Sequence, residues 1–104
     1  MTASTTTGTG SQLRTLARET VLLDRPLVDV ELSSRWDALE VLSLVRRYAH
    51  IVQLTPTRWL VRVISVGRDA AEVERDLGTI ADWAAKRARG PVTLVVGEHA
   101  VNLS

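Results

Sequence analysis

The sequence predicts one small α+β domain whose elements follow the order strand, helix, strand, strand, helix, strand. Three observations lead to this class. Apolar and polar residues alternate over residues 27–32, as they do in a strand with one buried face. Residues 73–88 repeat apolar side chains at the spacing of an amphipathic helix. Two further strand-like segments lie between them and are joined by a turn at Pro56-Thr57.

The chain length fits one domain. Its 104 residues match the common domain size, and 45% of them are apolar, which favours a globular chain over a disordered one. Residues 1–12 are the exception, because they are almost entirely Thr, Ser and Gly, and we expect a disordered tail there. Residues 13–26 hold either a short helix or a short strand at Val21 to Leu23. Residues 27–104 form the predicted α+β domain.

The first helix is predicted to begin after Ser34. Ser34 and Asp37 match a capping box, in which the serine hydroxyl accepts from backbone amides of the first turn. Apolar residues then recur at helical spacing, at Leu39, Leu42, Val45 and Ala49. Three more widen the stripe, namely Val41, Leu44 and Tyr48. We therefore expect a deeply buried helix, with Trp36 packed as a staple onto the sheet.

A hairpin is predicted from its two strands, Ile51 to Thr55 and Trp59 to Val66. The second strand is apolar on both faces, with Arg62 between, which is typical of a central strand. Trp59, Val61 and Val63 share one face, and Leu60, Ile64 and Val66 share the other.

The second helix follows Gly67, and Asp69 and Glu72 form its capping box. Its apolar stripe consists of Val73, Leu77, Ile80, Ala84 and Ala88. Gly90-Pro91 ends it, and Val92 to Val96 form the next strand. The segment Gly97-Glu98-His99 is either a bulge in that strand or a turn into a short strand from Ala100 to Leu103.

This order is that of the ferredoxin-like βαββαβ fold. Right-handed crossovers and the central hairpin give a four-stranded antiparallel sheet of order 4-1-3-2, with two helices on one face. An extra strand at Val21 to Leu23 would enlarge the sheet without changing its core.

Composition excludes several classes of partner. The net charge is +1, from 13 basic and 12 acidic residues spread along the chain, so no basic face for nucleic acid is predicted. No run of about 18 apolar residues that could span a membrane occurs. The absence of cysteine removes disulfides and thiolate metal sites, and it fits a cytoplasmic protein.

No residue pattern predicts catalysis, a cofactor or a metal. The glycines form no phosphate-binding motif, and the two histidines have no further ligand at metal-site spacing. His50 is expected at a helix end, and His99 beside Glu98, which could orient it as an acid-base pair.

We therefore predict a non-catalytic module that binds a protein partner or itself, as a homodimer, through the sheet face that the helices leave open. The expected interface consists of Asp29, Glu31, Leu60, Arg62, Ile64 and Val95. The alternative is a small enzyme or ligand-binding protein of the dimeric α+β-barrel type, which would need a polar-lined pocket between sheet and helices.

Overall fold

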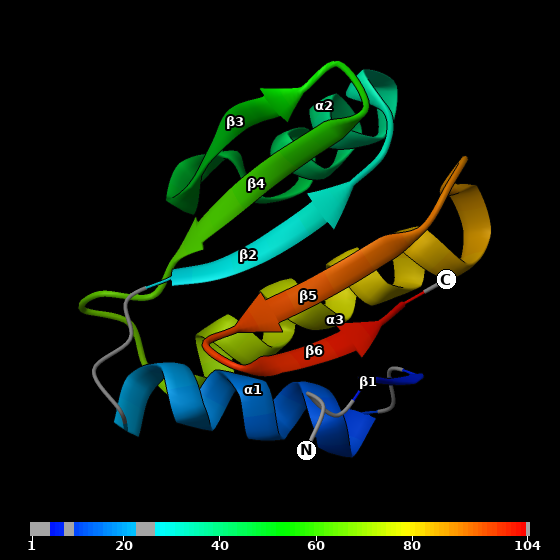
Figure 1. Cartoon of the computed structure of the whole chain (residues 1–104). Coiled ribbons are helices and arrows are strands. Elements are labelled where there is room, and N and C mark those ends of the chain that lie inside the picture. Colours follow the sequence, from blue (N-terminus) through cyan, green and yellow to red (C-terminus); the bar gives the residue numbers. More distant parts are fainter. Residues whose placement is uncertain (1–4, 8–9, 23–26, 104) are drawn as a thin grey trace.

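The structure is a computed structural model, and it describes residues 5–7, 10–22 and 27–103. Figure 1 shows its elements along the chain. The strands are β1 (Thr5–Thr7), β2 (Leu27–Leu32), β3 (Ala49–Thr55), β4 (Arg58–Ile64), β5 (Val92–Val96) and β6 (His99–Asn102). The helices are α1 (Gly10–Leu22), α2 (Arg35–Val45), the short 3-10 helix η1 (Arg46–Tyr48) and α3 (Ala70–Arg87).

The sheet confirms the α+β class but not the predicted size of the sheet. Its order is β1-β6-β5-β2-β4-β3, where β2 to β6 are antiparallel to their neighbours and β1 is parallel to β6. The predicted four-stranded sheet of order 4-1-3-2 with two helices therefore differs from the structure in the number and order of its strands and in the number of its helices. The added strand β6 exists because Gly97, with φ of 58°, forms a tight turn that returns the chain along β5. Of the two predictions for this segment, the turn into a short strand is correct.

The N-terminal segment also differs from the prediction. Residues 5–7 form β1, because their backbone pairs with the edge strand β6, and α1 begins at Gly10, so structured elements lie within the predicted tail 1–12. Residues 1–4 and 8–9 lie outside the described residues. Of the alternatives for residues 13–26, the helix is found, because Val21 and Leu22 belong to α1 and not to a strand; residues 23–26 lie outside the described residues. Leu16 and Ala17 of α1 are in the main core, so the domain begins before residue 27.

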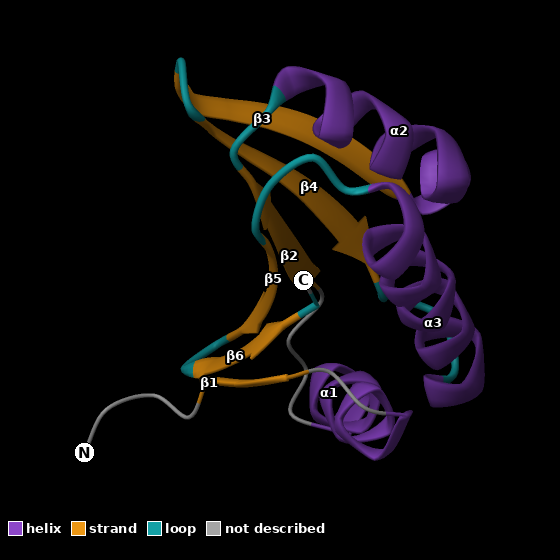
Figure 2. Cartoon of the chain, turned by 90° about the vertical axis from the view of Figure 1, so that its right-hand side faces the viewer, coloured by secondary structure: helices purple, strands orange, loops and turns teal. Residues whose placement is uncertain are grey.

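The three long helices lie on the same side of the sheet, as Figure 2 shows. They bury the alternate residues of β2, β4 and β5 that point toward them, and α1 packs along α3. The predicted stripe of α3 is confirmed, with Val73, Leu77 and Ile80 fully buried and Ala84 nearly so. The sheet contributes Val28, Val30, Val61, Val63, Val92 and Leu94, all with no exposed surface.

Helix α2 is rotated relative to the prediction. Its buried apolar residues are Ala38, Val41 and Val45, while Leu39 and Leu44 are exposed. Trp36 is 68% exposed and does not staple the helix to the sheet. The reason is that Asp37, beside Trp36, is buried against the end of α3, and this contact turns the indole outward.

The helix caps form largely as predicted. The hydroxyl of Ser34 accepts hydrogen bonds from the amides of Trp36 and Asp37, at 3.1 and 3.5 Å. The carboxylate of Asp69 accepts from the amide of Glu72 at 2.9 Å. The capping box at Ser34 is only half formed, because the Asp37 carboxylate binds another segment of the chain. No helix among the described residues has the length and apolar character needed to cross a bilayer.

Candidate functional site

The face of the sheet opposite the helices is called the open face, because no described helix lies over it (Figure 2). Val28, Val30 and Leu32 of β2 point into the core, so Asp29 and Glu31 between them point to the open face. The strand register pairs Asp29 with Arg62 on β4. All six residues of the predicted interface therefore lie on this face, at Asp29, Glu31, Leu60, Arg62, Ile64 and Val95.

Two ion pairs cross the centre of the open face. Asp29 Oδ1 lies 3.2 Å from Arg62 Nε, as the register predicts. Glu31 does not share Arg62, because Arg58 Nη2 donates a hydrogen bond to Glu31 Oε1 at 2.8 Å. The acidic side chains thus come from β2 and the basic ones from β4. Sequence reasoning missed Arg58, although its place two residues before Leu60 on the same face of the strand was readable from the alternation.

Apolar side chains surround these ion pairs. Ile64 and Val95 are half-buried, and so is Val52 of β3, which pairs with Leu60. Leu60 is only 7% exposed although no described element covers it, because its neighbours on three strands shield it. The open face therefore carries half-buried apolar side chains around two ion pairs whose charges cancel. The strand register places the polar side chains of His50, Thr93 and Asn102 on the same face.

The two histidines do not form an acid-base site with the predicted partners. His50 lies on β3, opposite Arg62, rather than at a helix end. His99 Nε2 lies 3.5 Å from Glu19 Oε1 of α1. That contact replaces the predicted pairing with Glu98, because β6 and α1 approach each other in the tertiary structure. Within residues 5–7, 10–22 and 27–103, no group of three or more His, Asp or Glu side chains could hold a metal ion.

A shallow pocket of about 430 Å³ lies at the carboxyl end of α2, and Leu44, Arg46, Arg47, Tyr48 and Asp76 are among its lining residues. It is not the pocket between sheet and helices that a dimeric α+β-barrel enzyme requires.

Beside this pocket, the buried side chain of Arg68 contacts three elements of the chain. The Arg68 guanidinium lies 3.9 Å from the centroid of the Tyr48 ring. Its Nη2 donates to Asp76 Oδ2 at 2.6 Å, and its Nη1 donates to the carbonyl of Ile64 at 3.1 Å. Because Arg68 links β4, η1 and α3, it has a structural role. The sequence contained no signal for it, since its partners lie in three separate segments.

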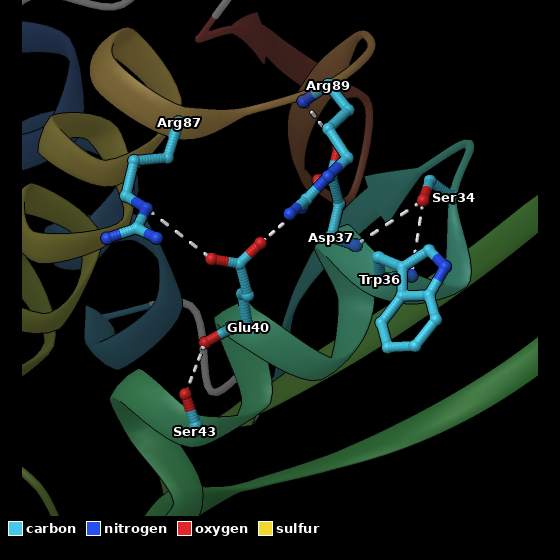
Figure 3. Close-up of polar contacts among 7 residues, drawn as sticks. All are labelled: Ser34, Trp36, Asp37, Glu40, Ser43, Arg87 and Arg89. Carbon is cyan, nitrogen blue, oxygen red and sulfur yellow. Dashed lines mark hydrogen bonds and ion pairs between the residues drawn. The ribbon is translucent and has the colours of Figure 1, made fainter.

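A second polar cluster joins the start of α2 to the end of α3 (Figure 3). The buried carboxylate of Asp37 accepts from the backbone amide of Arg89 and from its Nη1, both at 2.9 Å. Arg89 Nη1 also donates to Glu40, and Arg87 Nε lies 3.6 Å from the other oxygen of Glu40. Figure 3 shows Trp36 pointing away from this cluster. Both carboxylates of α2 are therefore occupied by arginines of another segment.

These contacts shift two ionisation equilibria. The hydrogen bond from Arg89 lowers the pKa of Glu40 below its ordinary value, and the nearby charges of Arg89 and Arg87 act in the same direction. The hydrogen bonds to Glu40 and Asp37 raise the pKa of Arg89. Both shifts favour the charged forms of Glu40 and Arg89, and the cluster links the start of α2 to the segment after α3.

Comparison with protein-family models, with curated proteins and with solved structures finds no match for this chain. Two surfaces of the described chain combine apolar and charged side chains that solvent reaches: the open face, where the apolar ones are half-buried, and the outside of α2, where they are exposed.

Proposed function

We propose that this protein is a non-catalytic module that associates with a second copy of itself, or with a protein partner, through the open face. One observation carries the proposal: all three long helices lie on one side of the sheet, and the other side holds Ile64, Val95 and Val52 half-buried around two ion pairs. Association is favourable when a second surface removes such half-buried apolar side chains from water, because their burial lowers the free energy.

The charges on the open face favour a second copy as the partner. Its acids, Asp29 and Glu31, stand on β2, and its arginines, Arg58 and Arg62, stand on the neighbouring strand β4. A twofold axis parallel to the strands and midway between β2 and β4 would place each acidic strand opposite the basic strand of the other copy. The two sheets would then stack as layers about 10 Å apart, with their strands roughly aligned.

Within such a contact the ion pairs would set orientation more than affinity. Removing charged groups from water offsets much of the attraction between them. Removing apolar side chains from water favours association. The affinity would come from Ile64, Val95 and Val52.

The experiment is the molecular mass in solution of the wild type and of Ile64→Glu, measured over a range of concentrations. We expect a dimeric wild type and a monomeric variant, because Ile64→Glu brings an unpaired carboxylate into an apolar contact. Val66→Glu is the matched control, since Val66 is exposed in the loop after β4 and should leave the mass unchanged.

Thermal unfolding of both variants checks that the fold is kept. A wild type that stays monomeric at millimolar concentration would exclude the homodimer. If Ile64→Glu unfolds the chain, Ile64 belongs to the core and the open face is wrongly assigned.

Two finer features belong to the same proposal. The four strands β5, β2, β4 and β3 are consecutive in the sheet, which supports a ferredoxin-like unit extended by β6 and β1. The absence of cysteine supports a place in the reducing cytoplasm.

A further inference from the structure

A second exposed surface lies on the side of α2 that faces away from the sheet. At about 100° per residue, Trp36 lies opposite the buried Val45 on the helix. We define the basic apolar surface as Arg35, Trp36, Leu39 and Leu44 of α2 together with Arg46 and Arg47 of η1. Leu39 and Leu44 lie on either side of Trp36 around the helix. Its apolar members are 68%, 39% and 41% exposed, in the order Trp36, Leu39 and Leu44. These are three of the large hydrophobic side chains that the described fold leaves in water.

The charge of this surface is strongly positive. Its three arginines are exposed, and none has an acidic partner among the described residues. The two carboxylates of α2 cannot supply one, because Asp37 and Glu40 are bound by Arg89 and Arg87. The whole chain carries only +1, so this excess is local.

The surface also has a fixed shape. The contacts of Asp37 and Glu40 with the end of α3 hold one end of α2 (Figure 3). Arg68 holds Tyr48 at the other end, where the pocket of about 430 Å³ opens beside Leu44. A partner would therefore meet side chains on a backbone that is already ordered, which reduces the entropy lost on binding.

We propose that the basic apolar surface binds an acidic segment of a protein partner that carries one or two apolar anchor residues. Carboxylates of the segment would pair with Arg35, Arg46 and Arg47, and an apolar anchor would enter the pocket beside Leu44. Trp36 would cover a second anchor, since exposed tryptophan is among the residues that dominate binding energy at interfaces. From Trp36 to Leu44 the helix α2 advances about 12 Å, the length of about four extended or eight helical residues, and η1 carries the surface beyond that.

The surface favours a protein segment over the other anionic partners. A nucleic-acid site needs more phosphate contacts than three arginines provide. A helix that binds an anionic membrane surface needs a continuous apolar face, whereas this surface has three separated apolar side chains.

The test is a selection of random 12-residue peptides on the immobilised full chain. We expect the enriched peptides to be acidic and to contain Leu, Ile, Phe or Trp. Their affinity for Trp36→Ala should be at least about thirtyfold weaker, which corresponds to the loss of an interface hot spot. For the double variant Arg46→Gln, Arg47→Gln we expect about fivefold to tenfold weaker binding at low salt and a smaller difference at high salt.

Arg18→Gln on α1 is the matched control, because Arg18 is also exposed and lies on another helix. It should bind like the wild type. Ile64→Glu, a variant of the open face, should bind the selected peptides as tightly as the wild type. Peptide binding and self-association are therefore tested by different variants, and either proposal can fail alone. Enrichment of neutral or basic peptides, equal binding to Trp36→Ala, or no enrichment would overturn the proposal. Tighter binding of single-stranded DNA or of phosphatidylserine vesicles than of the selected peptides would also overturn it.

Discussion

Arg89 donates two hydrogen bonds to the carboxylate of Asp37, one from its backbone amide and one from its guanidinium, and each is 2.9 Å long. The two residues are 52 positions apart in the sequence. Asp37 is fully buried, whereas the side chain of Arg89 is 53% exposed. The pair closes the loop between α3 and β5 onto the first turn of α2, which places the two helices relative to each other.

We expect Asp37→Ala to lower the free energy of unfolding by about 1–3 kcal/mol, because it leaves the amide of Arg89 without its acceptor. Urea unfolding followed by circular dichroism measures the change. Asp82→Ala is the control, since the exposed pair of Asp82 with Lys86 should contribute less than about 0.5 kcal/mol. Equal effects of the two substitutions would show that the buried Asp37 contact contributes no more to stability than an exposed ion pair.

The contribution of Glu40 should depend on pH. Its pKa in the folded protein lies below the ordinary 4.5, because Arg89 donates a hydrogen bond to it. The stability linked to this shift is therefore complete above pH 4.5 and is lost as the pH falls through the lowered pKa. We expect the wild type to be more stable than Glu40→Gln at pH 7, and the difference to shrink below pH 4.5. Urea midpoints of both proteins across this range provide the test, and a constant difference would contradict it.

The core should depend on Leu77 far more than on Leu39. Leu77 is fully buried in α3, so Leu77→Ala should cost about 2–5 kcal/mol of unfolding free energy. Leu39 is partly exposed on α2, so Leu39→Ala should cost less than about 1 kcal/mol. Thermal or urea unfolding of both variants compares them. A cost below about 1 kcal/mol at Leu77 would mean that α3 presents another side to the core.

The helix α1 should be required for full stability. A chain that begins at residue 23 lacks Leu13, Leu16 and Ala17, which are buried in the same core as the sheet. Losing the two leucines alone should lower the free energy of unfolding by about 3–6 kcal/mol, which is a large part of the stability of a small domain. Urea unfolding of the shortened and full chains measures this, and equal midpoints would restore the domain boundary at residue 27.

Several elements could be predicted because their signals are local. The alternation in β2 and the stripe of Val73, Leu77 and Ile80 depend only on residues within a few positions of each other. The caps at Ser34 and Asp69 bind amides of their own first turns, so they too could be predicted. The side of the sheet on which Asp29 lies follows from the same alternation, once the neighbouring valines are assigned to the core.

Other features were decided only by contacts between distant segments. Periodicity shows which residues share a side of α2, but its apolar residues encircle more than half of the helix, so two rotations satisfied the pattern. The buried Asp37, held by Arg89, selected the rotation that exposes Trp36. In the same way, β1 pairs with the edge of β6, and the position of β6 beside α1 places His99 next to Glu19. The physical reason is that the sequence itself determines which side chains lie together on one element, whereas the packing of whole elements decides which of those sides touches a neighbour.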